Sequence, residues 1–109
     1  MATFFKNSVV KNIGTTPVKV VETQTNSRAT VIGLSLTNLT LGTIQVSVLV
    51  QDDTSTMGYY CKDVLVPANT SLRLVNGGEK LILGNSNELY ISSNSENAVD
   101  ALISYVEIV

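Results

Sequence analysis

Between residues 64 and 90 the chain alternates short apolar runs with residues that favour chain reversal. Proline fixes φ and cannot donate to a central strand, whereas glycine and asparagine tolerate the positive φ of tight turns. We interpret 76–78 as a hairpin turn, because no helix pattern follows it that could present amides to a phosphate. Runs this short, separated by turn residues, are typical of a compact antiparallel β domain. The apolar runs are 64–66, 72–75 and 81–83, and the turns are Pro67-Ala68-Asn69, Asn76-Gly77-Gly78 and Gly84-Asn85-Ser86-Asn87.

The rest of the chain carries further strand patterns and no segment with a helical period. An N-terminal arm with a short edge strand at 8–13 is expected over residues 1–16, and a single sandwich domain over 17–109. Connections are too short for parallel crossovers. The sequence therefore predicts an all-β, antiparallel β-sandwich of the jelly-roll or immunoglobulin-like kind, with about seven to nine strands. Besides the runs above, we expect strands at 17–22, 29–38, 44–50, 59–66, 88–92 and 99–109.

Alternation within these runs predicts which side chains face the core. The cleanest strand, 44–50, places Val46 and Val48 inward, and it should form a long hairpin with 59–66. Within 29–38 the expected inward residues are Ile32, Leu34 and Leu36. In the last strand they are Leu102, Val106 and Ile108, with a bulge between Asp100 and Glu107.

Composition and charge disfavour several classes of partner. The chain has 109 residues, a net charge of −2 and no basic run, which disfavours a nucleic-acid role. No apolar run approaches the roughly 18 residues of a membrane span, and the N-terminus lacks the apolar region of a signal peptide. Cys61 is the only cysteine, so no internal disulfide forms and synthesis in a cytosol fits. Only 15% of residues are charged and the mean hydropathy is +0.25, which favours burial in an assembly.

Candidate chemical sites are few. The chain has no histidine, which excludes histidine triads and histidine-bound metals, and one cysteine excludes a cysteine-rich zinc site. The carboxylates of Asp52, Asp53, Asp63 and Glu79 could gather around Ca²⁺, but a polar hairpin loop is the preferred interpretation. The tyrosines could form a sugar-binding face, although core or interface positions are preferred. We predict no enzyme, and no catalytic, cofactor or metal residues. The tyrosines are Tyr59, Tyr60, Tyr90 and Tyr105.

Phe4 and Phe5 are the only phenylalanines, and they lie where chains normally fray. Adjacent residues in an extended arm point to opposite sides. We therefore expect one ring to pack on its own sandwich and the other on a neighbouring subunit. These two residues are the predicted assembly interface, and the chain is expected to form a homo-oligomer.

Five motifs resemble a family of small virion structural proteins of tailed bacteriophages, notably marine and cyanobacterial ones. An acidic turn that relatives often carry is replaced here by 84–89. The resemblance implies a β-sandwich virion component present in many copies. The motifs are Phe5-Lys6-Asn7, 31–38, 66–72, 78–83 and 104–108.

The resemblance and the low charge together predict a non-enzymatic virion protein that is made in the host cytoplasm. Our first hypothesis is a capsid decoration or cement protein that binds assembled head subunits. A tail, neck or baseplate component is one alternative. Another is a tail-fibre-type module that binds host surface glycans through loops such as 51–58 and 93–97. Expected partners are major capsid or tail proteins, with no nucleic acid and no membrane.

Overall fold

The computed structural model describes residues 2–75 and 79–109, and none of these residues is helical. No helix that could cross a membrane occurs in this part of the chain. The described residues form nine strands, at the upper end of the predicted number. They are β1 (Thr3–Ile13), β2 (Val18–Glu22), β3 (Arg28–Asn38), β4 (Ile44–Gln51), β5 (Met57–Val66), β6 (Ser71–Val75), β7 (Leu81–Leu83), β8 (Glu88–Ser93) and β9 (Val99–Ile108).

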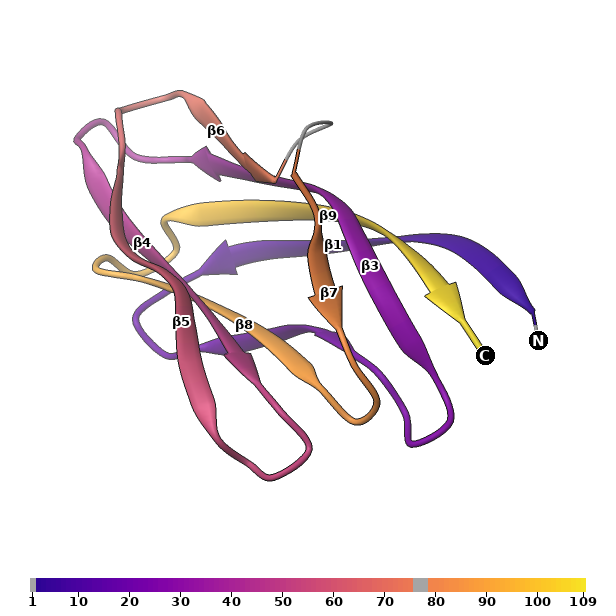
Figure 1. Ribbon diagram of the computed structural model, residues 1–109. Coiled ribbons are helices and arrows are strands. Elements are labelled where there is room, and N and C mark those ends of the chain that lie inside the picture. Colours follow the sequence, from indigo (N-terminus) through magenta and orange to yellow (C-terminus); the bar gives the residue numbers. More distant parts are fainter. Residues whose placement is uncertain (1, 76–78) are drawn as a thin grey trace.

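The strands form two antiparallel sheets that face one another. One sheet has the order β1-β9-β3-β6, with β7 also paired to β3, and the other has the order β2-β8-β4-β5 (Figure 1). The first and last strands are therefore neighbours, and successive strands lie in different sheets except for β4–β5 and β6–β7. This order is that of the jelly roll, the first of the two predicted sandwich types. The predicted β4–β5 hairpin is confirmed, with Ile44 opposite Val66 and Gln51 opposite Met57.

The strands β6 and β7 lie end to end along β3. Val75 of β6 is opposite Leu34, whereas Leu81 of β7 is opposite Val31, and both strands run antiparallel to β3. They therefore run in the same direction and are not the two arms of a hairpin, so the hairpin interpretation of this region is wrong. The turn residues Asn76-Gly77-Gly78 lie outside the described residues.

The core lies between the two sheets and is aliphatic. Val46 and Val48 have no exposed surface, which confirms the predicted face of β4. Each buried aliphatic side chain of this size contributes about 1.5–3 kcal/mol of burial free energy. The largest fully buried side chains are Ile13, Leu34, Leu36, Leu83, Leu89, Ile91, Ile103, Val31, Val46, Val48, Val66 and Val75.

The inward face of β3 differs from the prediction at one position. Leu34 and Leu36 are buried as expected, but Ile32 is 37% exposed and Val31 is fully buried in its place. The register with β9 shifts between Val31 and Gly33. A bulge adds one residue to the strand and so reverses the alternation on its N-terminal side. The prediction assumed an uninterrupted strand and was therefore wrong for Ile32.

The inward face of β9 was also predicted incorrectly. Val99, Ala101 and Ile103 are buried, whereas Leu102 is 46% exposed. Val106 and Ile108 are only half-buried. Because Ala101 has a small side chain, the set that contains Val99, Ala101 and Ile103 looks less apolar in the sequence than the predicted set.

The strand β1 is longer than the predicted edge strand at 8–13, because it begins at Thr3. It pairs with β9 in an unbroken register from Thr3 opposite Ile108 to Val10 opposite Ala101. Ala2 and Val109 exchange both backbone hydrogen bonds, at 3.0 and 2.9 Å, so the two chain ends lie together (Figure 1). The strand order leaves the other side of β1 at the edge of its sheet.

Candidate assembly surface

The side of the β1-β9-β3 sheet that faces away from β2-β8-β4-β5 carries large apolar side chains in solvent. Because alternate residues point to opposite faces, the buried Ala101 and Ile103 direct Leu102 outward. We call this side the outer face. Large exposed apolar patches on soluble proteins mark interaction sites. The exposed fractions on this face are 81% for Phe5, 66% for Val9, 63% for Ile82, 46% for Leu102 and 37% for Ile32.

These apolar side chains are neighbours across the strands. Val9 is opposite Leu102, and Phe5 is opposite the half-buried Val106. Thr30 of β3 links Val106 on one side to Ile82 of β7 on the other. The apolar surface therefore extends across four neighbouring strands.

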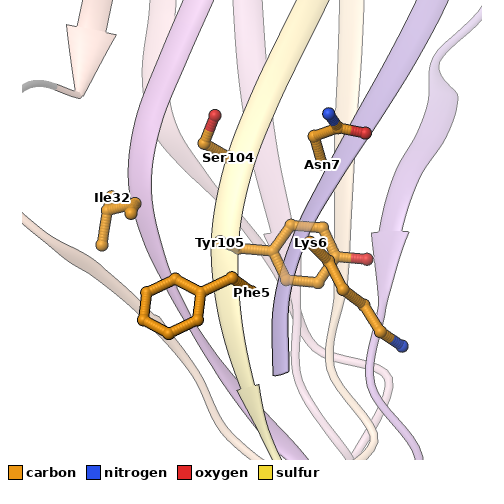
Figure 2. Close-up of a pocket in the computed structure, with 6 residues that line it drawn as sticks. All are labelled: Phe5, Lys6, Asn7, Ile32, Ser104 and Tyr105. Carbon is orange, nitrogen blue, oxygen red and sulfur yellow. The ribbon is translucent and has the colours of Figure 1, made fainter. Parts of the chain in front are cut away.

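A shallow hollow of about 580 Å³ lies within this region. Figure 2 shows the ring of Phe5 extending from β1 across β9 toward Ile32 of β3. The floor is small, because Ser104 is opposite Gly33, which has no side chain. A hollow beside an exposed ring and an exposed isoleucine can receive an apolar group from another surface. It is lined by Phe5, Lys6, Asn7, Ile32, Ser104 and Tyr105.

Two ionic groups on and beside the outer face, Asp100 and Lys6, are bound locally. Asp100 accepts a hydrogen bond from the backbone N–H of Asn12 at 3.0 Å. Lys6 points to the opposite side of β1, where its ammonium bonds Glu107 at 2.6 Å and lies 5.8 Å from the centre of the Phe4 ring. The hydrogen bond to Glu107 raises the pKa of Lys6. The centre of the face is therefore neutral, with small polar residues between the apolar ones.

The two residues predicted as the assembly interface lie on opposite sides of β1. Phe5 is on the outer face, whereas Phe4 is on the side of Lys6 and is 48% exposed. Alternation along the strand produces this arrangement, as the sequence predicted. Their packing on a neighbouring subunit stays a prediction.

Three of the four acidic residues considered for Ca²⁺ are engaged separately. The Asp52 carboxylate accepts hydrogen bonds from the backbone N–H groups of Thr54 and Thr56, at 2.9 and 3.0 Å. Its pKa is lowered, first by the hydroxyl of Thr54, which donates at 2.7 Å. Asp63 pairs with Ser47, and Glu79 accepts from the hydroxyl of Tyr60 at 3.0 Å. Within residues 2–75 and 79–109 no three acidic, histidine or cysteine side chains are grouped to hold a metal.

The four tyrosines do not share one face. Tyr60 and Tyr105 pack against the core, as the preferred interpretation predicted. Tyr59 is 56% exposed and lies beside Leu49, which is in turn opposite Tyr90. On the other sheet, two half-exposed tyrosines therefore flank a leucine. Two separated rings do not form a continuous aromatic surface on which a sugar could stack.

Cys61 is half-buried and lies opposite Val48 against the core. Burial raises the pKa of its thiol. A thiol that is protonated at neutral pH is a poor nucleophile and a poor metal ligand. Its position fits a packing role.

The loops proposed for glycan binding lie at opposite ends of β4. The loop after β4 is closed by the Asp52 hydrogen bonds, beyond Gln51. The loop after β8 instead contacts the start of β4, where the N–H of Asn94 donates to the carbonyl of Gln45 at 3.0 Å. One ligand-binding site cannot combine both loops.

Sequence comparison finds no matching protein-family profile and no matching curated protein. Solved structures share the fold at very low identity. A chain of the Bacillus endospore appendages, which form disulfide-linked pili, has a TM-score of 0.57 and 10% identity, covering 96% of this chain and 86% of that one.

Two viral structures are also similar. A chain of the T13 particle of infectious bursal disease virus has a TM-score of 0.58 and 7% identity, covering 96% of this chain and 30% of that one. For the Gx strain of that virus the values are 0.55 and 10%, covering 98% and 33%. This chain thus spans about a third of the viral chains. At these identities the likeness concerns the fold.

Proposed function

We propose that the protein is a non-enzymatic structural component of a virion, and that it decorates and cements the head of a tailed bacteriophage. In this role many copies bind assembled capsid subunits and bridge them. The motifs shared with small phage virion proteins support the phage assignment.

The observation that carries the proposal is the apolar outer face of the β1-β9-β3 sheet. A solitary domain gains nothing from exposing Phe5 at 81% and Val9 at 66%, whereas a subunit that is covered in an assembly does. Protein interfaces are depleted of charged residues at their centre, as this face is. Its apolar side chains and the small hydroxylated residues between them fit contact with another protein better than contact with nucleic acid.

The similar structures support an assembly role by analogy. One belongs to pili and two to viral particles, and jelly rolls recur in viral capsid domains. The same fold also occurs in lectins, so the fold alone does not select a function. The outer face favours a protein partner, because its exposed apolar side chains extend across four neighbouring strands and so suit a broad contact.

Many weak contacts between copies of the protein and the capsid shell are sufficient to stabilise the shell. Each copy that binds the assembled shell and not its free subunits stabilises the shell by mass action. A symmetric array multiplies this effect, since neighbouring contacts act at high effective concentration. Modest affinity per copy is therefore sufficient.

Location and particle stability test the proposal together. A labelled antibody against the protein should decorate heads of intact virions, and particles that lack the protein should lose resistance to heat and osmotic shock. Labelling of the neck, tail or baseplate would contradict the decoration role and support the first alternative. Head labelling with unchanged resistance would contradict the cement mechanism.

The glycan-binding alternative has a separate test. It predicts that the isolated protein binds host cells or their lipopolysaccharide. The separation of the two candidate loops along β4 argues against it, and an inert protein that binds purified heads would exclude it.

A further inference from the structure

The open edge of β1 presents backbone groups of alternate residues. Ala2 and Val109 exchange both of their hydrogen bonds, which identifies them as a hydrogen-bonded pair of the antiparallel ladder. Because such pairs alternate, even-numbered residues of β1 bond to β9. The N–H and C=O groups of Thr3, Phe5, Asn7 and Val9 therefore point away from β9, toward the open edge.

The other edges in the described part of the chain are shorter or irregular. The strand β2 has five residues and a register shift, and β6 and β7 have five and three. The edge strand β5 is long, but its pairing shifts twice and Asp63 has a φ of 53°. Bulges and short strands are the usual devices that prevent edge-to-edge pairing.

The strand β1 lacks these devices over most of its length. Its register is unbroken from Thr3 to Val10, and the irregularity follows only at Asn12, where φ is 56°. Lysines also blunt edges, but the Lys6 ammonium is bound by Glu107 at 2.6 Å, and Lys11 comes after Val10, at the irregular end of the strand. This edge is therefore available for a further strand.

We propose that a second copy of this chain pairs with it, β1 to β1, in antiparallel register about a twofold axis, with Asn7 opposite the partner's Asn7. Phe5 is then opposite the partner's Val9, and Thr3 is opposite the partner's Lys11. All these residues have their backbone groups at the open edge and their side chains on the outer face. The pairing joins the two β1-β9-β3 sheets and makes their apolar outer faces continuous.

Three features select a second copy and this register. A twofold pairing is self-complementary, since each strand supplies the same donors and acceptors. Residues that are opposite one another must have their side chains on the same face, so their numbers are both odd or both even. This condition excludes the repulsive register in which Lys6 is opposite the partner's Lys11. Among even registers, centring on Asn7 uses the whole span from Thr3 to Lys11 and sets Lys6 opposite the partner's Ser8.

The interface is small. A nine-residue strand pair is about 30 Å long, and an edge contact of that length buries less than the roughly 800 Å² per partner of a stable complex. We therefore expect a weak dimer in solution that many-copy assembly reinforces. The inference rests on the proposed assembly role, but its test uses the isolated protein without any particle. Failure of the β1–β1 pairing would therefore leave the virion role to be tested separately, and the reverse also holds.

Disulfide trapping tests the pairing. In a Cys61→Ala background, Asn7→Cys places two thiols in a pair whose Cα atoms are about 5.5 Å apart, within the roughly 4.4–6.8 Å that disulfides span. Thr3→Cys is the matched control on the same strand and face, because the two copies of residue 3 lie about 27 Å apart. Both variants are oxidised at high protein concentration after circular dichroism has verified their fold. Asn7→Cys should form disulfide dimers about tenfold faster than Thr3→Cys.

A mixed experiment fixes the register. Phe5→Cys and Val9→Cys proteins should cross-link with each other and not with themselves, since the copies of residue 5 lie about 14 Å apart. Equal rates for Asn7→Cys and Thr3→Cys, or no dimer from either, would overturn the pairing. Self-linking of Phe5→Cys that is faster than the mixture would overturn the register.

Discussion

The side-chain amide nitrogen of Asn38 donates a hydrogen bond to the carbonyl oxygen of Val66 at 3.0 Å, which joins the ends of β3 and β5 across the sandwich. The same nitrogen donates to the carbonyls of Gly42 and Pro67 at 2.9 and 3.1 Å. Its amide oxygen accepts from the N–H of Thr40 at 2.8 Å. Asn38 is 2% exposed, so this one side chain satisfies buried backbone groups of two connections.

Replacing Asn38 should therefore be costly. In Asn38→Ala the carbonyls of Val66 and Gly42 lose the amide donor of Asn38, and Gly42 keeps only the hydroxyl of Thr40 at 2.8 Å. We expect a loss of about 3 kcal/mol in the free energy of unfolding. Urea denaturation measures it. Asn26→Ala, at an exposed asparagine in a turn, is the control and should change stability by less than about 0.5 kcal/mol. Equal effects of the two substitutions would show that the Asn38 bonds are not important.

The core prediction concerns Val48, which has no exposed surface. Val48→Asp buries an unpaired carboxylate and should prevent folding. Gln45→Asp on the same strand places the same group in solvent and should fold. Circular dichroism and gel filtration distinguish the two, and a soluble, cooperatively melting Val48→Asp protein would invert the assigned faces of β4.

Acid should destabilise the protein through carboxylates bonded in loops. Glu96 accepts hydrogen bonds from the hydroxyl and the N–H of Thr15, which lower its pKa below the ordinary 4.5, and loop hydrogen bonds lower the pKa of Asp52 below 3.8. A lowered folded-state pKa gives stability that is present above the unfolded value and lost as pH falls through the folded one. The melting temperature should therefore stay level above these ordinary values and fall below them. Glu96→Gln should flatten that fall, and an unchanged acid slope would contradict the assignment.

Deletion of residues 2–6 tests the N-terminal part of β1. It removes the pairs from Thr3–Ile108 to Lys6–Tyr105 but leaves Ser8 opposite Ile103 and Val10 opposite Ala101. Because Phe4 and Phe5 are 48% and 81% exposed, little burial is lost. We expect a folded domain with a slightly lower melting temperature that no longer assembles. Unfolding of the truncated protein would assign this segment to the core, and normal assembly would remove it from the interface.

The fold class was predictable because turn residues and alternation are local signals. The alternation of Val46 and Val48 gave the correct face of β4. It failed at Ile32, because a bulge depends on the partner strand and leaves no local mark. Strand pairing is also non-local, so the end-to-end arrangement of β6 and β7 could not be derived from their turn residues.

The candidate surface was only partly predictable. Phe4 and Phe5 stand out in the sequence because both lie at the N-terminus. Val9 and Leu102 do not, since an apolar residue in a strand is normally assigned to the core. A usable signal was present in β9, where the small Ala101 lies between Val99 and Ile103. Val99, Ala101 and Ile103 also alternate along the strand. Assigning these three residues to the core would have placed Leu102 on the exposed face.

The most direct test of the assembly account is rebinding to virions stripped of the protein, measured by co-sedimentation. The wild-type protein should rebind to saturation. The double variant Phe5→Ser/Leu102→Ser should fold and fail to rebind, because it removes apolar side chains that are 81% and 46% exposed on the outer face. The matched variant Tyr59→Ser/Leu65→Ser changes side chains of β5 in the other sheet that are 56% and 61% exposed, and should rebind normally. Normal rebinding of the first variant, or selective loss in the second, would contradict the assignment of the outer face as the assembly surface.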